Sequence, residues 1–106
     1  MKQWFALAAL AAVSIGAQAQ TFPGNKPVSI VVPFTAGGPT DRVARDLAEA
    51  MRKQIPGSNF VVENAAGAGG TIGATKVAKA NPDGHTLLLF NIGMAATPAL
   101  YRKIAY

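Results

Sequence analysis

The chain has 106 residues, enough for one domain, and carries 10 Lys+Arg against 5 Asp+Glu, a formal charge of +5 at pH 7. It contains no cysteine, which excludes disulfide frameworks, thiolate metal sites and cysteine nucleophiles. The basic residues are scattered, with no run of five like charges and no interleaved aromatic platform. The composition therefore argues against a nucleic-acid partner.

The first nineteen residues have the features of a cleavable secretory signal. Lys2 gives a positive start, and the apolar run WFALAALAAVSI is followed by the small-residue motif AQA, Ala17 to Ala19. As a helix that run would be roughly 18 Å long, well short of the ~30 Å hydrocarbon core of a membrane. We predict a signal peptide over residues 1–19 and an exported, periplasmic protein over residues 20–106.

The next elements are a buried strand and an amphipathic helix, joined by the loop PFTAGGPTDR. The strand, about Val28 to Pro33, is a nearly continuous apolar run, as expected of a strand covered on both faces. Pro39 suits the first turn of the helix, and the sequence IPG at 55–57 ends it. The predicted apolar stripe consists of Val43, Ala44, Leu47, Ala48, Met51 and Ile55.

Charged residues on the other face of this helix are spaced for i,i+4 ion pairs. The predicted pairs are Arg42–Asp46, Arg45–Glu49 and Glu49–Lys53. Asp41 places a negative charge in the first turn, where the helix dipole favours it. We expect its carboxylate to cap backbone groups, or to accept a hydrogen bond from a ligand amine or water.

The second half repeats the strand–loop–helix order. We predict a strand over 59–64 (NFVVEN), a glycine loop over 65–71 (AAGAGGT) and a helix over about 72–80. The turn NPDG at 81–84 leads into a third apolar strand, HTLLLFN, at 85–91. The remaining residues, IGMAATPALYRKIAY, predict a short helical turn and a loop.

This β-α-β-α-β order with short connections predicts an α/β fold with a parallel sheet and right-handed crossovers. In such sheets ligands bind beyond the carboxyl ends of the strands, where both glycine loops and Asn91 to Gly93 lie. A glycine loop leading into a helix offers unpaired N–H groups and a positive dipole end, which suit a small anion. The predicted ligand-binding residues are Phe34, Thr35, Ala36, Gly37, Gly38, Thr40, Asp41, Asn64, Gly67, Ala68, Gly69, Gly70, Asn91 and Gly93.

Enzymatic alternatives have less support. The segment GAGGTIG resembles a dinucleotide fingerprint, but its third glycine would have to stand at Ile72, and no P-loop lysine is present. His85 stands at the opposite end of its strand from the glycine loops, and the acids show no spacing typical of acid–base catalysis or metal ligation. We predict no catalytic residue, no metal and no cofactor. A nucleotide-binding enzyme fragment, and glycines that serve only as tight turns, remain as alternatives.

Three motifs, in order, resemble a known family. PFTAGGPTDRVAR, VVENAAGAGGTIGATKVAKANPDGHTLLL and TPALYRKIAY are similar to segments of the periplasmic solute receptors of tripartite tricarboxylate transporters, the Bug-type proteins. The resemblance runs from about Phe22 to Tyr106. It implies a two-lobed receptor, a monomer at full length, that closes on its ligand without a cofactor.

The resemblance also implies a ligand and a partner. Family members capture small carboxylates, which include di- and tricarboxylates, amino acids and aromatic acids, and pass them to membrane permease subunits. Their ligand loops correspond here to Phe34–Asp41, Asn64–Gly70 and Asn91–Gly93, where backbone groups, hydroxyls and bridging waters would hold the carboxylate.

The resemblance covers only the front part of such a receptor. Family members run to roughly two domains, so residues 20–106 would be the N-terminal part of the first lobe and carry half of a cleft. We expect this chain, as a fragment or a truncated, non-functional remnant, to bind carboxylates weakly or not at all on its own.

Overall fold

The computed structural model describes residues 21–106, so the predicted signal peptide lies outside the described residues. Three parallel strands form one sheet in the order β2-β1-β3: β1 (Val28–Val32) at the centre, β2 (Phe60–Asn64) and β3 (Thr86–Leu88) at the edges. Helix α2 (Pro39–Gln54) connects β1 to β2, and α3 (Thr71–Ala78) connects β2 to β3. The predicted α/β class and β-α-β-α-β order are confirmed.

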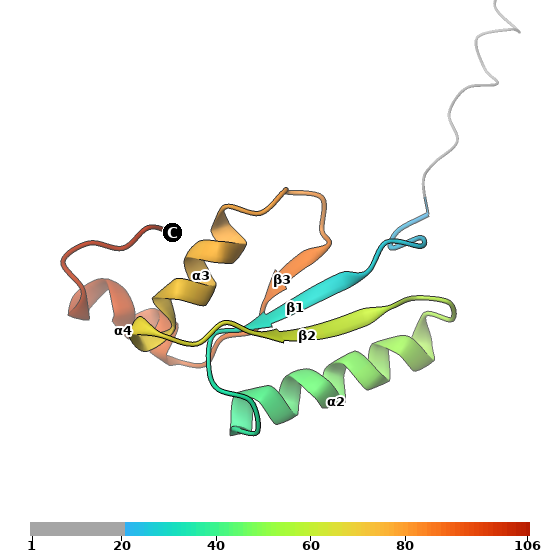
Figure 1. Ribbon diagram of the computed structural model, residues 1–106, viewed down its shortest axis with the longest axis horizontal. Helices are drawn as coiled ribbons and strands as arrows, with labels where there is room; N and C mark the ends of the chain where they lie inside the picture. The colour runs from blue at the N-terminus through green and yellow to red at the C-terminus, as the bar shows by residue number, and fades with distance from the viewer. Residues whose placement is uncertain (1–20) are drawn as a thin grey trace, which may run out of the picture.

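The two helices lie on opposite sides of the sheet (Figure 1). This follows from the strand order, because the chain first moves from β1 to one neighbour and then crosses back to the other. When both crossovers are right-handed, two moves in opposite directions place their helices on opposite faces. A third helix, α4 (Gly93–Leu100), follows β3, and a short 3₁₀ turn, η2 (Ala68–Gly70), precedes α3.

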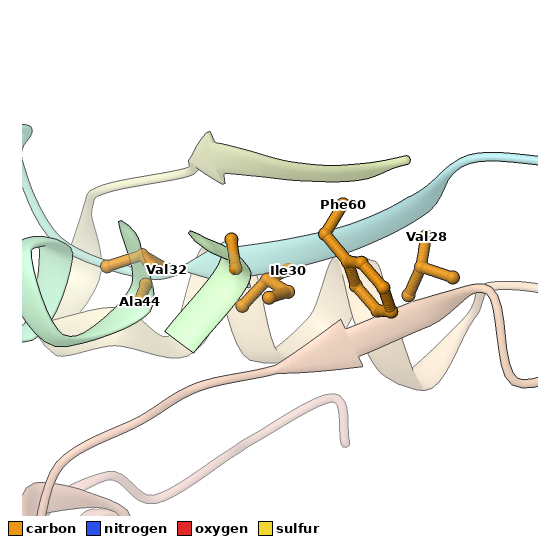
Figure 2. Packing of buried hydrophobic residues seen from close by; sticks show 6 residues of the cluster. Val28, Ile30, Val32, Ala44 and Phe60 are labelled. Atoms are coloured by element: carbon orange, nitrogen blue, oxygen red, sulfur yellow. The ribbon is translucent and has the colours of Figure 1, made fainter. Parts of the chain in front are cut away.

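The main core lies between the sheet and α2. Val28, Ile30 and Val32 point to one face of β1 because side chains alternate along a strand, and all three are buried. Figure 2 shows them beside Ala44 of α2 and Phe60 of β2. A small alanine at the contact lets the helix backbone lie close to the strands.

The opposite face is covered by α3, which also makes its closest approach through small residues. Gly73 and Ala74 are buried. A Cβ atom at Gly73 would lie 2.7 Å from the Cβ of Pro33, closer than real Cβ atoms come. Val31 of β1 is fully buried. Burial of the central strand on both faces explains its continuous apolar sequence.

The apolar stripe predicted on α2 is wider than the buried stripe. Ala44 and Ala48 are buried and Met51 and Ile55 pack against the core, as predicted, but Val43 and Leu47 are exposed on the described surface. The i, i+4 spacing identifies one side of a helix. How much of that side is covered depends on the width of the sheet beneath it.

Of the three ion pairs predicted on α2, one forms in residues 21–106, and Arg42–Asp46 is not among the ion pairs there. Lys53 pairs with Glu49 as predicted, at 3.3 Å, and Arg52 joins the same carboxylate at 3.2 Å. Arg45 pairs with Asp41 instead of Glu49. An arginine can reach a carboxylate one turn away in either direction, and the more buried acid gains more from the pairing.

The third strand is shorter and the last helix longer than predicted. β3 covers Thr86–Leu88 instead of residues 85–91, because β1 ends at Val32 and the chain after Leu89 turns away from it. Leu89 N–H still donates to the Val31 carbonyl at 3.0 Å. The predicted short helical turn is the eight-residue helix α4, which contains Pro98.

Candidate functional site

The carboxyl ends of the three strands meet at one edge of the sheet, and a loop leaves each strand there. We call them the first loop (Phe34–Asp41), the second loop (Asn64–Gly70) and the third loop (Asn91–Gly93). The first loop begins after Pro33 and runs into the first turn of α2. The strand order reverses across β1, and in parallel sheets such a reversal opens a crevice for ligands.

Asn64 joins the first and second loops. Its side-chain Nδ2 donates to the Phe34 carbonyl at 3.1 Å and to Asp41 Oδ1 at 2.9 Å. Both amide hydrogens are therefore used within the protein. The end of β2 is thus tied to the loop after β1 by a side chain that the sequence had suggested as a ligand contact.

Asp41 is the most constrained charged residue at this edge. Its carboxyl group is buried, with a residue exposure of 2%. Besides the Asn64 bond, Oδ2 accepts from the Gly37 N–H at 2.8 Å and from Arg45 Nε at 2.9 Å. The Arg45 guanidinium, then the Gly37 N–H and the Asn64 amide, hold the pKa of Asp41 well below its usual range. The expected backbone capping by Asp41 is present, as its bond to Gly37 shows.

The second loop packs against the residue that follows β3. Gly70, with φ +95°, lies so close to Phe90 that a Cβ atom there would be 2.4 Å from the ring. Phe90 in turn packs edge-to-face on Phe34 of the first loop, with ring centroids 5.2 Å apart. Phe90 therefore joins all three strand ends through one aromatic contact and one glycine.

The second loop also contains a backbone outlier. Ala68 has φ +46°, a left-handed conformation that costs an L-residue with a Cβ atom about 1 kcal/mol or more. Such residues cluster at binding and active sites. Gly67, Ala68 and Gly69 are exposed, so this strained segment faces outward at the edge where the loops meet.

In the third loop, the predicted site residue Asn91 bonds within its own turn. Its Oδ1 accepts from the Gly93 N–H at 2.8 Å, at the start of α4. The residue is exposed, and its side-chain Nδ2 forms no hydrogen bond to another residue of the range 21–106.

Two of the helices that begin at this edge, α2 and α3, have no side-chain caps. Gly38 is the N-cap residue of α2 and Gly70 that of α3, and neither position forms a side-chain capping bond. The positive ends of both helix dipoles lie at the loops, an arrangement that favours small anions. At the start of α3 the Thr71 N–H already donates to the Ala68 carbonyl of the preceding 3₁₀ turn. Beside the first loop is a hollow of 510 Å³, lined by Ala36, Gly37, Asp41, Arg42, Arg45 and Asp46. No residue of the second or third loop lines it.

His85 lies away from these loops. Its Nε2 is 3.1 Å from the Pro23 carbonyl oxygen, and its ring packs edge-to-face on Phe22. Among residues 21–106 no group of three or more His, Cys, Asp or Glu could hold a metal ion. No helix in that same range is both long enough and apolar enough to cross a membrane.

Two residues that organise this edge were not among the predicted site residues. The sequence predicts an ion pair between Arg45 and Glu49. The spacing of four residues between Asp41 and Arg45 is an equally good signal for the pair that forms. Phe90 was assigned to the third strand, and no local pattern in the sequence indicates that its ring covers Gly70. The first was detectable from spacing, the second only from the fold.

Comparison with known proteins identifies the family. The family model described as "Tripartite tricarboxylate transporter family receptor" matches residues 43–106. The chain belongs to this receptor family. It is 53% identical over 90 residues to a protein of Agrobacterium vitis encoded in the TAR-I ttuE-ttuC' intergenic region, covering 85% of this chain and 26% of that protein. It is 38% identical over 102 residues to BugT of Bordetella pertussis, covering 91% of this chain and 31% of BugT.

Solved receptors have the same fold over this region. The periplasmic binding protein BugD matches with a TM-score of 0.72 and 57% identity, over 76% of this chain and 27% of BugD. MatC of Rhodopseudomonas palustris, solved with bound malate, matches with a TM-score of 0.70 and 50% identity, over 76% of this chain and 28% of MatC. Rpa4515 of R. palustris, solved with adipate, matches with a TM-score of 0.73 and 40% identity, over 81% of this chain and 28% of Rpa4515.

Family membership narrows the functional alternatives. The family consists of binding proteins, not enzymes, so the nucleotide-binding enzyme alternative is wrong. Relatives of this chain are periplasmic binding proteins. The chain spans between a quarter and a third of the length of the curated relatives described above.

Proposed function

We propose that this chain is the N-terminal part of the first lobe of a periplasmic receptor that binds a small carboxylate. The observation that carries the proposal is the meeting of three loops and two helix N-termini without side-chain caps at one sheet edge. Two converging positive dipole ends match the two charges of a short dicarboxylate. The strain at Ala68 on the same edge adds support.

The ligand class and the partner follow from the relatives. Malate is bound in the MatC structure and adipate in that of Rpa4515, and both are small dicarboxylates. In this proposal the ligand lies against the edge formed by the 14 predicted site residues, the exposed ones contact it directly or through water, and Asp41, Asn64 and Gly70 hold the loops. A signal peptide over residues 1–19 directs export, and permease subunits of the transporter receive the ligand. The alternative of a non-functional remnant stays a hypothesis beside it.

A chimera tests whether these loops can hold a carboxylate. Residues 21–106 replace the corresponding part of MatC, so that this edge faces a complete second half of the cleft. Calorimetry with malate should then detect binding, while the dimethyl ester of malate, which lacks the charges, should give none. A folded chimera that leaves malate unbound would contradict the proposal.

A matched pair of variants separates ligand binding from turn formation. Gly38→Val places a branched side chain over the start of α2, where the backbone is extended (φ −76°) and a Cβ atom meets only the Thr35 carbonyl at 3.5 Å. Malate affinity of the chimera should fall about tenfold or more because the anion can no longer approach the helix N-terminus. Ala50→Val, on the exposed face of α2, should leave the affinity unchanged. If the glycines serve only as turn residues, Gly38→Val should leave the malate affinity as unchanged as Ala50→Val does.

A further inference from the structure

We infer that Arg45 is a positioning residue of this site: it holds the Asp41 carboxylate against the first and second loops and offsets its negative charge beside the ligand. The inference rests on the proposed function. It adds to the site a residue that is not among the 14 predicted site residues. Arg45 acts through Asp41 and Asn64, so it needs no contact with the ligand itself.

The geometry places one guanidinium between two loop-bearing elements. Arg45 Nε donates to Asp41 Oδ2 at 2.9 Å, and Nη2 lies 3.4 Å from Asn64 Oδ1. The planar fork of an arginine can serve both acceptors at once, whereas a lysine offers a single point charge. Asn64 completes the ring of contacts through its own bond to Asp41.

Burial makes this pairing necessary. The side chain of Asp41 is only 3% exposed, while that of Arg45 is 54% exposed. A buried carboxylate that loses its cation is strongly destabilised, and the protein adjusts by exposing or protonating it. Either response would release the Gly37 N–H from Asp41 and free the first loop.

The charge of Asp41 is the second reason why the site needs Arg45. Asp41 and Arg45 both line the hollow beside the first loop, together with the charged residues Arg42 and Asp46. A carboxylate ligand approaching the start of α2 would be repelled by an uncompensated Asp41. Because Arg45 lies directly against that carboxylate, the pair presents little net charge and the helix dipole can attract the anion.

The positioning role is tested in the ¹⁵N-labelled 106-residue chain by hydrogen exchange of the Gly37 amide. Arg45→Met should speed this exchange about tenfold, because the bond to Asp41 is no longer held in place. Arg45→Lys should restore part of the protection. Arg42→Met, which removes an arginine from the same hollow, serves as the matched control, and the Ile30 amide reports whether each variant keeps its core. A Gly37 rate that changes no more in Arg45→Met than in Arg42→Met overturns the inference.

A malate titration of the MatC chimera tests the charge effect, because the chimera supplies the other half of the cleft. With the wild-type residues 21–106 in the chimera, malate should shift the loop amides. Arg45→Met should require about tenfold more malate, and Arg45→Met/Asp41→Asn should recover most of the loss because no unpaired charge remains. If the double variant does not recover malate affinity, the proposal that Arg45 offsets the charge of Asp41 is overturned. If malate shifts no amide of the wild-type chimera, the proposed function fails, while the Gly37 comparison in the 106-residue chain still decides the positioning role.

Discussion

At the scale of single residues, the candidate site depends on side chains that contact each other rather than on a set of ligand groups. Asp41 and Asn64 direct their polar atoms into the protein and join the loops. Several donors of the glycine segments are used in the same way, because Gly37 N–H donates to Asp41, Gly70 N–H to the Gly67 carbonyl and the Thr71 hydroxyl to the Ala68 carbonyl. The donors that we propose for a ligand are the first-turn N–H groups of α2 and the hydroxyls of Thr35 and Thr40. That division suits a receptor in which the backbone recognises the charge of the ligand, and side chains fix the backbone.

The contact between Gly70 and Phe90 gives a prediction at this scale. Gly70→Ala adds a methyl group 2.4 Å from the ring at a backbone angle of φ +95°. We expect a loss of about 2–4 kcal/mol in the free energy of unfolding, the sum of left-handed strain and overpacking. Urea unfolding followed by circular dichroism measures it. Gly38→Ala, where a Cβ atom has ordinary space, is the control, and equal losses in the two variants would contradict the contact.

At the scale of elements, α2 fixes the position of the first loop, because its buried side is narrow and consists of small residues. Ala44 and Ala48 contact the sheet, while Val43 and Leu47 beside them are exposed. The helix therefore lies close to β1 and β2 and directs its uncapped start toward the sheet edge. Replacing either buried alanine by a larger residue would move the helix and with it the loop.

Ala48→Leu tests this close packing. The side chain of Ala48 is 1% exposed, so three added carbon atoms must displace the helix or the core. We expect a loss of about 1–3 kcal/mol and a change in the amide signals of the first loop. Leu47→Ala, at the neighbouring exposed position, is the control. Apart from a small helix-propensity effect, it should change the free energy of unfolding by less than about 0.5 kcal/mol. A stable Ala48→Leu variant with unchanged loop signals would show that α2 does not set the loop position.

At the scale of the whole molecule, acid stability should depend on a set of paired carboxylates. Asp41, Glu49, Glu63 and Asp83 each have a pKa below the ordinary value, chiefly through hydrogen bonds from Arg45, Arg52, Lys76 and Lys26 respectively. For Asp83 the pKa falls from 3.8 to about 2. Below the ordinary values the unfolded chain takes up protons that the folded chain does not. Stability is therefore complete above about pH 5 and declines as the pH falls toward the lowered pKa values.

Asp41→Asn tests the contribution of Asp41 to this pH dependence. At neutral pH the variant should be less stable than the wild type. The difference should shrink as the pH falls below 4, because the unfolded wild type then binds a proton at Asp41 that its folded state does not bind. Urea midpoints between pH 7 and pH 2.5 measure it. Asp46→Asn, on the exposed face of α2, is the control. A difference between Asp41→Asn and the wild type that stays constant over this range would exclude the charge of Asp41 as the cause.

The sequence by itself determined the order and type of the elements and the edge at which the loops meet. Continuous apolar runs, 3.6-residue periodicity and glycine or proline at the boundaries are local signals, and the parallel sheet follows from their alternation. The three motifs also led to the correct receptor family.

Only the tertiary structure decided which side chains meet. The choice of Asp41 over Glu49 by Arg45, the cover of Gly70 by Phe90, the exposure of Val43 and Leu47 and the early end of β3 all involve distances through space. Phe90 and Gly70 are twenty residues apart, and no periodic pattern connects them. The sequence sets the local conformation of each loop, but the packing of the strands determines what that loop faces.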